Sequence, residues 1–325
     1  MESIQNEYTN TINTIYGFAI ADALGVPAEF KDRLYLEKYP ITDMVGYGTH
    51  NMPEGTWSDD TSMTIAELDS IGNKGTIDYN DIMNNYVKWV KNAEYTGTGV
   101  FFDIGNTTRV AISNFVRGMN PIECGEKTIN SNGNGSLMRM IPFVLYLLEN
   151  PMSEAEEVEF INNASSLTHA HEISKLGCYI YTQYLKLLLE GKTKEEAYDE
   201  LKMFDYKKFY SEDSIQRYKR IINGDIPLLT KEQIKSSGYV VDTLEASIWC
   251  TLKSSNYKDS ALEAVNLGED TDTVAAITGS MLGVIYGYES IPQEWINKLK
   301  NKEYLTNLCK KFDDKIKRKE DKLSL

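Results

Sequence analysis

Apolar residues recur at intervals of three and four positions along most of this chain, and this spacing constrains the fold more than any other feature of the sequence. It is clearest in two stretches, at Ile12, Ile15, Tyr16 and Ala19 and again at Ile82, Tyr86, Trp89 and Val90. Such spacing places apolar side chains on one face of an α-helix, whereas the alternation typical of half-buried strands is scarce. We therefore predict an all-α fold.

The segment 175–202 predicts two helices separated at Gly191, and the segment 241–255 predicts another. The chain has 325 residues, of which 42% are hydrophobic, enough apolar material for a sizeable core. Neither a Pro/Ser-rich linker nor a fixed-period repeat divides it. We predict one domain over residues 1–325, with a peripheral hairpin as an alternative for the charged stretch 192–236 and a solvated helix end or frayed tail from about Phe312.

The formal net charge of -14 argues against binding to nucleic acid or to an anionic membrane surface, because both depend on clustered Lys and Arg. The polar N-terminus lacks the layout of a secretory signal, and the apolar run 141–148 is too short to span a membrane. We predict a cytoplasmic protein. Its cysteines have neither zinc-site nor disulfide spacing and are expected to be reduced and packed: Cys124, Cys178, Cys250 and Cys309.

Acidic and hydroxyl residues precede a predicted helix at two places. WSDDTSM begins at Trp57, and GEDTDTVAAITGS begins at Gly268. Helix capping accounts for part of this layout, because Ser, Thr and Asp satisfy the free N–H groups of a first turn and the helix dipole favours negative charge there. Capping needs one acid and one hydroxyl at each helix, and both segments contain more.

The surplus carboxylates are costly to bury without cations, and neither segment has a Lys or Arg nearby in the sequence. If the two loops met, their oxygens would suit Mg²⁺ or Mn²⁺, and two ions would fit the number of ligands better than one. Two separately capped helices remain the alternative at this point. An EF-hand is excluded, because Ala275 and Met281 occupy the positions of its glycine and its bidentate glutamate.

Two further motifs lie between the acidic segments. The Gly/Asn/Ser loop 131–136 opens onto an apolar helix and could bring backbone N–H groups to a phosphate, although it matches neither a Walker A loop nor GxGxxG, and a flexible turn is the alternative. His169 and His171 form an HxH pair for which no Cys or third His completes a zinc site. These two histidines could pack in the interior or cap a helix, and contact with a ligand is the alternative.

Taken together, the motifs resemble those of the ADP-ribosylglycohydrolase family, in the same order along the chain, from about Ile12 to Gly287. They are GFAIADALGVPAEF, PEGTWSDDTSMT, FDIGNTT, GNGSLMR, LTHAH, GYVVDTLEA and GEDTDTVAAITGSMLGVIYG. The chain looks most similar to the branch that contains dinitrogenase reductase-activating glycohydrolase. The joint occurrence of both acidic motifs with GNGSLMR makes the resemblance specific.

The resemblance implies an all-α hydrolase with a binuclear Mg²⁺ or Mn²⁺ centre that releases ADP-ribose from an ADP-ribosylated protein or small molecule. The implied metal ligands are Ser58, Asp59, Asp60, Asp270, Asp272 and Thr273. Glu29 and Asp103 are the implied catalytic acids, with Asp103 preferred at the leaving group and Glu29 at the metal or the water. The implied substrate-binding residues are Gly97, Gly99, Ser131, Asn132, Gly133, Asn134, Gly135, Ser136, His171 and Tyr239.

Three departures from the family pattern are small. Ala21 and Glu269 stand where Gly is common, and Ser58, where Thr is common, keeps the hydroxyl. Glu269 is expected to face solvent. The branch favours an N-glycosidic bond to arginine; serine-linked ADP-ribose, O-acetyl-ADP-ribose and ADP-ribosylated small molecules are the alternative substrates. A non-catalytic ADP-ribose-binding relative and a metal-dependent phosphohydrolase are the alternatives from other functional classes.

Overall fold

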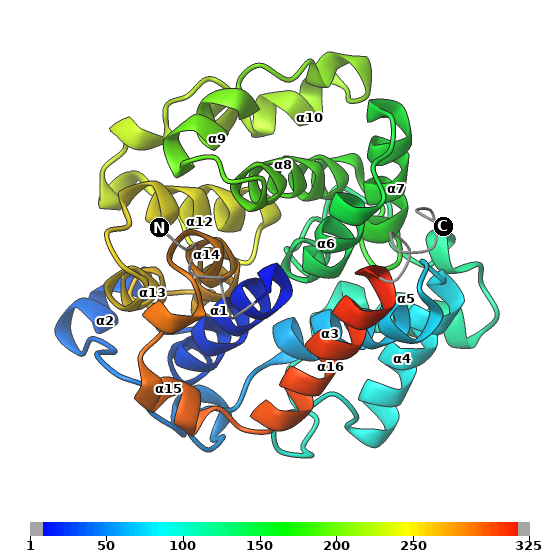
Figure 1. Cartoon of the computed structure of the whole chain (residues 1–325). Coiled ribbons are helices and arrows are strands. Elements are labelled where there is room, and N and C mark those ends of the chain that lie inside the picture. The colour runs from blue at the N-terminus through cyan, green and yellow to red at the C-terminus, as the bar shows by residue number, and fades with distance from the viewer. Residues whose placement is uncertain (1–8, 318–325) are drawn as a thin grey trace, which may run out of the picture.

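The computed structural model describes residues 9–317 and is built from α-helices joined by loops and short 3-10 turns (Figure 1). In this part of the chain the β-pairing consists of three isolated bridges. The prediction of an all-α fold is confirmed. The helices are α1 (Asn10–Gly25), α2 (Arg33–Lys38), α3 (Asp59–Lys74), α4 (Tyr79–Asn92), α5 (Asn106–Val116), α6 (Ile141–Glu149), α7 (Glu154–Ser166), α8 (Glu172–Leu189), α9 (Lys194–Leu201), α10 (Glu212–Arg217), α11 (Lys219–Ile222), α12 (Val240–Lys253), α13 (Tyr257–Val265), α14 (Thr271–Tyr286), α15 (Gln293–Lys298) and α16 (Lys302–Lys317).

Helices α1 and α14 form the centre of the fold, and their backbones touch. A Cβ atom built on Gly17 would lie 2.3 Å from the carbonyl oxygen of Gly279, and one on Gly283 would lie 2.1 Å from that of Asn13. In the sequence, Gly279, Gly283 and Gly287 recur every four positions, which predicts close packing of this helix against its neighbours. The prediction is confirmed at Gly279 and Gly283. The prediction is wrong for Gly287, which ends α14 with φ 78° and where an added Cβ atom would meet no other atom within 4 Å.

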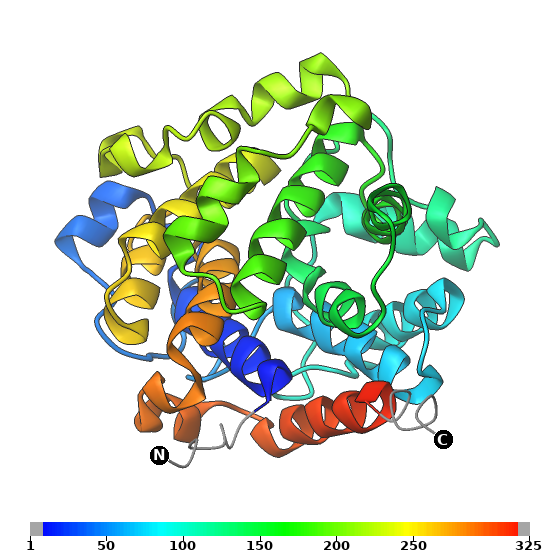
Figure 2. The same cartoon turned by 45° about the horizontal axis from the view of Figure 1, so that its top comes forward.

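The remaining helices surround this pair. Helices α12 and α13 lie beside α14, and α8 lies beyond α12 (Figures 1 and 2). Two separate helices, α8 and α9, confirm the predicted break at Gly191. The charged stretch 192–236 forms an outer layer of short helices rather than one hairpin (Figure 1).

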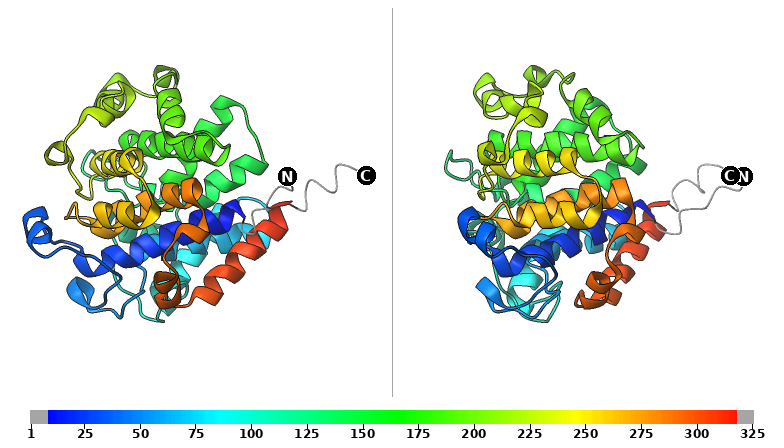
Figure 3. Two further views of the ribbon diagram at one scale, coloured as in Figure 1. Left: turned by 60° about the vertical axis from the view of Figure 1, so that its left-hand side comes forward. Right: turned by 90° about the vertical axis from the view of Figure 1, so that its left-hand side faces the viewer.

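Helix α16 packs along α3, with its start near α15 and its end close to the start of α1 (Figure 3). Thr11 Oγ1 donates a 2.6 Å hydrogen bond to Asp313 Oδ1. The tail expected from about Phe312 therefore begins inside α16, where Phe312 and Ile316 are buried. The residues after Lys317 lie outside the described part of the chain.

Buried hydrophobic side chains from Ile12 to Ile316 form one connected core. The four cysteines are unpaired and buried in it, as predicted. Within residues 9–317, no helix has the length and apolar character needed to cross a membrane.

Candidate active site and metal centre

The two acidic loops meet at the first turns of α3 and α14. Thr273 Oγ1 donates a 3.3 Å hydrogen bond to Asp60 Oδ1, across 213 positions of sequence. Carboxylate oxygens converge in two groups, Asp22 with Asp60 and Asp272, and Glu29 with Asp270 and Asp272; within each group they lie within 4.8 Å of one another. Separate capping of two distant helices is therefore excluded.

Asp22, on α1, is a member of this cluster that the sequence interpretation missed. Its carboxylate accepts hydrogen bonds from the backbone N–H of Ser58 at 3.0 Å and of Thr61 at 3.1 Å, and from Thr61 Oγ1 at 2.6 Å. Because these donors occupy both oxygens, Asp22 anchors the start of α3 to α1. Its signal was present in the sequence as one acid inside the apolar run FAIADALG.

Ser58 is the N-cap of α3 and stabilises the first turn of this helix. Its Oγ accepts a hydrogen bond from the N–H of Asp60 at 3.2 Å and lies 3.3 Å from Asp60 Oδ2. Asp59, the residue between them, faces a cavity of ≈ 200 Å³ that is also lined by Glu29, Asp103 and Asp270.

The carboxyl groups of this cluster are strongly desolvated. Asp60 and Asp272 are 0% and 1% exposed. Burial raises the pKa values of Asp59, Asp60 and Asp272 well above their ordinary range, and the negative charges of the neighbouring acids raise them further. Without a bound cation, the cluster holds protons that free aspartates release.

The cluster could hold a metal ion. Among residues 9–317, no Lys or Arg forms an ion pair with these aspartates. Asp270 Oδ1 is buried and has no hydrogen-bond partner in the described structure, while Asp270 Oδ2 accepts a 2.8 Å bond from Asn134. An all-oxygen donor set with unneutralised charge suits a hard divalent cation.

Glu29 and Asp103 lie next to each other, and beside both lies His50, the second residue that the sequence interpretation missed. His50 Nε2 contacts Glu29 Oε2 and lies 3.9 Å from Asp103 Oδ2. Burial, followed by the charges of Asp103 and Asp270, raises the pKa of Glu29 to about 10. Burial also raises the pKa of Asp103, against the opposing charge of His50. Both predicted catalytic acids thus line the ≈ 200 Å³ cavity, hereafter the carboxylate cavity.

The loop 131–136 divides between this cavity and the protein interior. Gly133, Asn134 and Gly135 line the carboxylate cavity. Asn132 is turned inward and accepts from the N–H and Oγ of Ser174, at 3.2 and 2.9 Å.

The two serines at the ends of this loop also bond away from the cavity. Ser131 is 2.6 Å from Thr128 Oγ1, and Ser136 Oγ is 3.3 Å from Cys178 Sγ and accepts from Ser165. The contribution of the loop to the cavity wall therefore comes from its centre.

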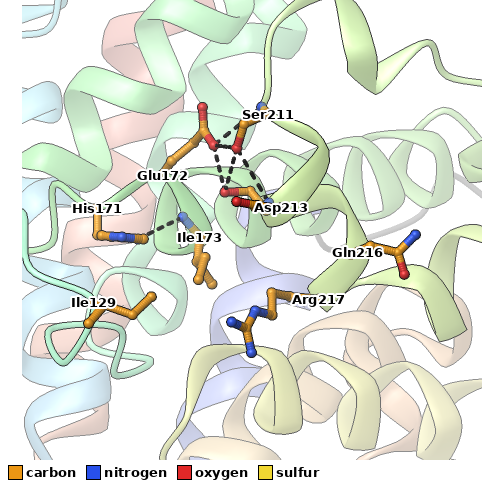
Figure 4. A pocket seen from close by; sticks show the side chains of 9 residues that line it. Ile129, His171, Glu172, Ile173, Ser211, Asp213, Gln216 and Arg217 are labelled. Carbon is orange, nitrogen blue, oxygen red and sulfur yellow. Dashed lines mark hydrogen bonds between the residues drawn. The ribbon is translucent and has the colours of Figure 1, made fainter.

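His171 lines a second cavity, of ≈ 600 Å³, which we call the His171 cavity. Figure 4 shows His171 and Ile129 on one side of it and Arg217 on the other. His171 also caps α8, because its Nδ1 accepts from the N–H of Ile173 at 3.2 Å. His169, which is not among the substrate-binding residues that the resemblance implies, lines the carboxylate cavity; burial lowers its pKa to about 3, so it is neutral.

The two cavities have no lining residue in common, but one loop contributes to both. The loop that contributes Ile129 to the His171 cavity continues to Gly133 in the carboxylate cavity, and a β-bridge joins Gly133 to Tyr239. Gly97 and Gly99 line neither cavity; Gly97 lies beside the Trp57 ring and Gly99 is exposed.

Comparisons with known proteins agree with this site. The family model described as ADP-ribosylglycohydrolase matches residues 5–322. The chain is 33% identical over 302 residues to an ADP-ribosylarginine hydrolase, Tri1, of Pseudomonas putida (strain GB-1), covering 93% of this chain and 77% of the relative. It is 27% identical to the ADP-ribosyl-[dinitrogen reductase] glycohydrolase of Rhodospirillum rubrum, with 90% of each chain covered.

A solved structure described as an ADP-ribosylglycohydrolase-related protein complex superposes with a TM-score of 0.78 at 25% identity, covering 94% of this chain and 98% of that one. The agreement thus extends from the motifs to the arrangement of the helices that carry them. A match over nearly all of the sequence, together with the convergence of both acidic loops, establishes that the chain belongs to the ADP-ribosylglycohydrolase family.

Proposed function

We propose that this protein hydrolyses the N-glycosidic bond between ADP-ribose and an arginine side chain, with two divalent metal ions, Mg²⁺ or Mn²⁺, in the acidic cluster. The observation that carries the proposal is the convergence of Asp60 and Asp272 beside the cavity that Glu29 and Asp103 line. The arginine acceptor is supported by the relatives named ADP-ribosylarginine hydrolase, at 33% and 32% identity.

The proposed metal ligands are Ser58, Asp59, Asp60, Asp270, Asp272 and Thr273. Two ions are supported by two converging carboxylate groups that share Asp272. When bound, they would supply the Lewis acidity that acidifies a water or hydroxyl near the anomeric carbon. Asp22 belongs to one of these two groups and is a further candidate ligand, while its hydrogen bonds from Ser58 and Thr61 would orient the start of α3.

The residues that surround Glu29 and Asp103 indicate a different role for each of these two acids. Among the described residues, Glu29 converges with Asp270 and Asp272, whereas the group that includes Asp103 consists of Glu29 and His50. We therefore assign Glu29 to the metal side, where it accepts a proton from water, and Asp103 to the proton that the leaving group needs. Negative charge around the ribose would stabilise the positive charge that develops as the glycosidic bond breaks.

The remaining parts of ADP-ribose fit the adjoining surfaces. Backbone N–H groups of Gly133 and Gly135 would contact the diphosphate, whereas the N–H of Asn134 donates to the carbonyl of Gly238 at 3.0 Å. The adenosine would extend into the His171 cavity (Figure 4). Tyr239, which a β-bridge joins to Gly133, would lie along the way. Gly97 and Gly99 would act only at the outer margin, since they line neither cavity. A cytoplasmic location without nucleic-acid or membrane partners completes the proposal.

The test is release of ADP-ribose from arginine-modified and from serine-modified peptide in the presence of Mg²⁺ and, separately, of EDTA. We expect Mg²⁺-dependent release of intact ADP-ribose from the arginine peptide. Release from the serine peptide alone would change the acceptor, appearance of AMP on chromatography would indicate a phosphohydrolase, and binding without turnover would indicate a non-catalytic relative.

A further inference from the structure

Three aromatic rings from separate loops form a row beside the two catalytic acids. The ring centroids of Phe30 and His50 are 6.0 Å apart, and those of His50 and Phe102 are 5.2 Å apart. The central ring of the row, His50, is the one that contacts Glu29 and lies 3.9 Å from Asp103. The three rings do not line the carboxylate cavity themselves, but the row adjoins it through His50, because Glu29 and Asp103 are lining residues.

The outer rings of this row are not part of the hydrophobic core. Phe30 is 69% exposed, although its backbone is held by a 2.7 Å hydrogen bond from its N–H to the carbonyl of Glu269. Phe102 is half-buried, whereas its neighbour Phe101 packs against Trp89 with ring centroids 5.0 Å apart. The chain thus uses Phe101 for packing and leaves Phe30 and Phe102 facing a ligand or solvent.

Aromatic faces next to carboxylates have the chemistry that recognises a planar cation. A guanidinium stacks on aromatic rings and is attracted by their faces, and a nearby carboxylate adds charge complementarity. The guanidinium of an ADP-ribosylated arginine keeps its plane and positive charge. A serine oxygen or an acetyl ester offers neither, so this surface would not favour such acceptors.

We propose that Phe30 and Phe102, on either side of His50, bind the guanidinium of the acceptor and select arginine-linked ADP-ribose over serine-linked ADP-ribose. The proposal rests on the proposed function and adds the residues that decide the acceptor. It places the acceptor on the Phe30 side of the carboxylate cavity, with the nucleotide in the His171 cavity.

The test compares Phe30→Leu and Phe102→Leu, which keep apolar bulk without a ring, with Phe30→Tyr and Phe102→Tyr, which keep the ring. For an ADP-ribosylated arginine peptide we expect each Leu variant to raise KM about 3- to 30-fold, as loss of one cation–π contact implies. The inhibition constant of ADP-ribose, which lacks the guanidinium, should stay within about twofold of wild type. The Tyr variants should restore KM.

Tyr35→Leu is the matched control, because Tyr35 is an aromatic side chain, 46% exposed, on the neighbouring helix α2. Tyr35→Leu should change neither KM for the arginine peptide nor the inhibition constant of ADP-ribose. The inference is overturned if the Leu variants leave KM unchanged, if KM and the ADP-ribose inhibition constant rise together, or if the Tyr variants behave like the Leu variants. A wild-type protein that releases nothing from the arginine peptide overturns the proposed function instead, before any variant is compared, and the inference falls with it.

Discussion

Helix α3 carries two kinds of buried carboxylate, and the difference between them separates fold from function. In its middle, Glu67 is fully buried and paired: Arg139 Nη1 lies 2.7 Å from Glu67 Oε1, and the Tyr86 hydroxyl donates to the same oxygen. At its start, Asp59 and Asp60 are buried among other acids, and no Lys or Arg of the described chain pairs with them.

The pair in the middle of α3 is complete in charge, because Arg139 balances Glu67, although Glu67 Oε2 and Arg139 Nε have no hydrogen-bond partner in the described structure. Arg139 also donates to the carbonyl of Ala164 at 3.0 Å and to Thr168 Oγ1 at 2.8 Å, so it ties α3 to α7 and the loop that follows it. The acids at the start of α3 are incomplete by the same standard, because burying a charge requires a compensating partner. A bound cation is the partner that would complete them.

The largest expected effect comes from removing one charge of the incomplete cluster. Asp272→Asn should lower Mg²⁺-dependent ADP-ribose release by about 10³-fold or more, since metal-assisted charge stabilisation contributes several kcal/mol to a transition state. Glu269→Gln removes the same charge three residues away on an exposed side chain and should leave turnover close to wild type. Comparable turnover in the two variants would contradict the assignment of the cluster as the metal centre.

Breaking the complete pair should affect stability, with or without metal. Glu67→Gln leaves Arg139 buried without its counter-charge, and we expect the free energy of unfolding to fall by about 3–5 kcal/mol. Urea denaturation with Mg²⁺ and with EDTA measures this. Glu200→Gln is the control and removes an exposed ion pair with Lys192. Its free energy of unfolding should stay close to that of the wild type, both with Mg²⁺ and with EDTA. If Mg²⁺ reversed the loss in Glu67→Gln, the two regions of α3 would not be independent.

The pH dependence of the metal-free protein should reveal the incomplete cluster. Burial raises the pKa of Asp22 from 3.8 to about 6, so the folded protein keeps a proton that the unfolded chain releases. The contribution of this proton to the free energy of unfolding is fully present below about pH 4 and is lost as the pH rises to about 6. It amounts to on the order of 2–3 kcal/mol, because the two pKa values differ by about two.

Melting temperatures of wild type and Asp22→Asn between pH 4 and 7, in EDTA, measure this contribution. Asparagine does not titrate and keeps an oxygen for the N–H groups of Ser58 and Thr61, so the variant should lose less stability with rising pH. If the melting temperature changed equally with pH in the two proteins, Asp22 would not have a raised pKa.

The smallest effect concerns the orientation of one carboxylate. Asn134→Ala removes the 2.8 Å hydrogen bond to Asp270 Oδ2 and should weaken Mg²⁺ or Mn²⁺ binding about tenfold, as loss of an orienting partner does at other metal sites. Calorimetric titration measures the affinity independently of turnover. Unchanged affinity would mean that the backbone bond from the N–H of Asp270 to Ser236 O, at 3.0 Å, orients this residue alone.

Sequence patterns anticipated the helices and the acidic loops because both depend on neighbours within a few positions. His50 lies far from Glu29 and Asp103 in sequence, in an irregular segment, and carries no pattern that links it to them. The location of His169 was harder to predict, since an HxH pair does not reveal which of its two histidines faces which cavity. Asp22 was the exception, because an acid inside an apolar helix is visible without a structure.

By itself, the sequence determined that this chain is helical, that acids and hydroxyls begin two of its helices, and that Gly279 and Gly283 permit close packing. Only the tertiary structure decided that carboxylate oxygens of Asp60 and Asp272 lie within 4.8 Å of each other, and that His50 lies beside both Glu29 and Asp103. The reason is physical. Capping and helical periodicity act between near neighbours, whereas a metal site depends on distances between residues more than 200 positions apart, which follow from how α1, α3 and α14 pack.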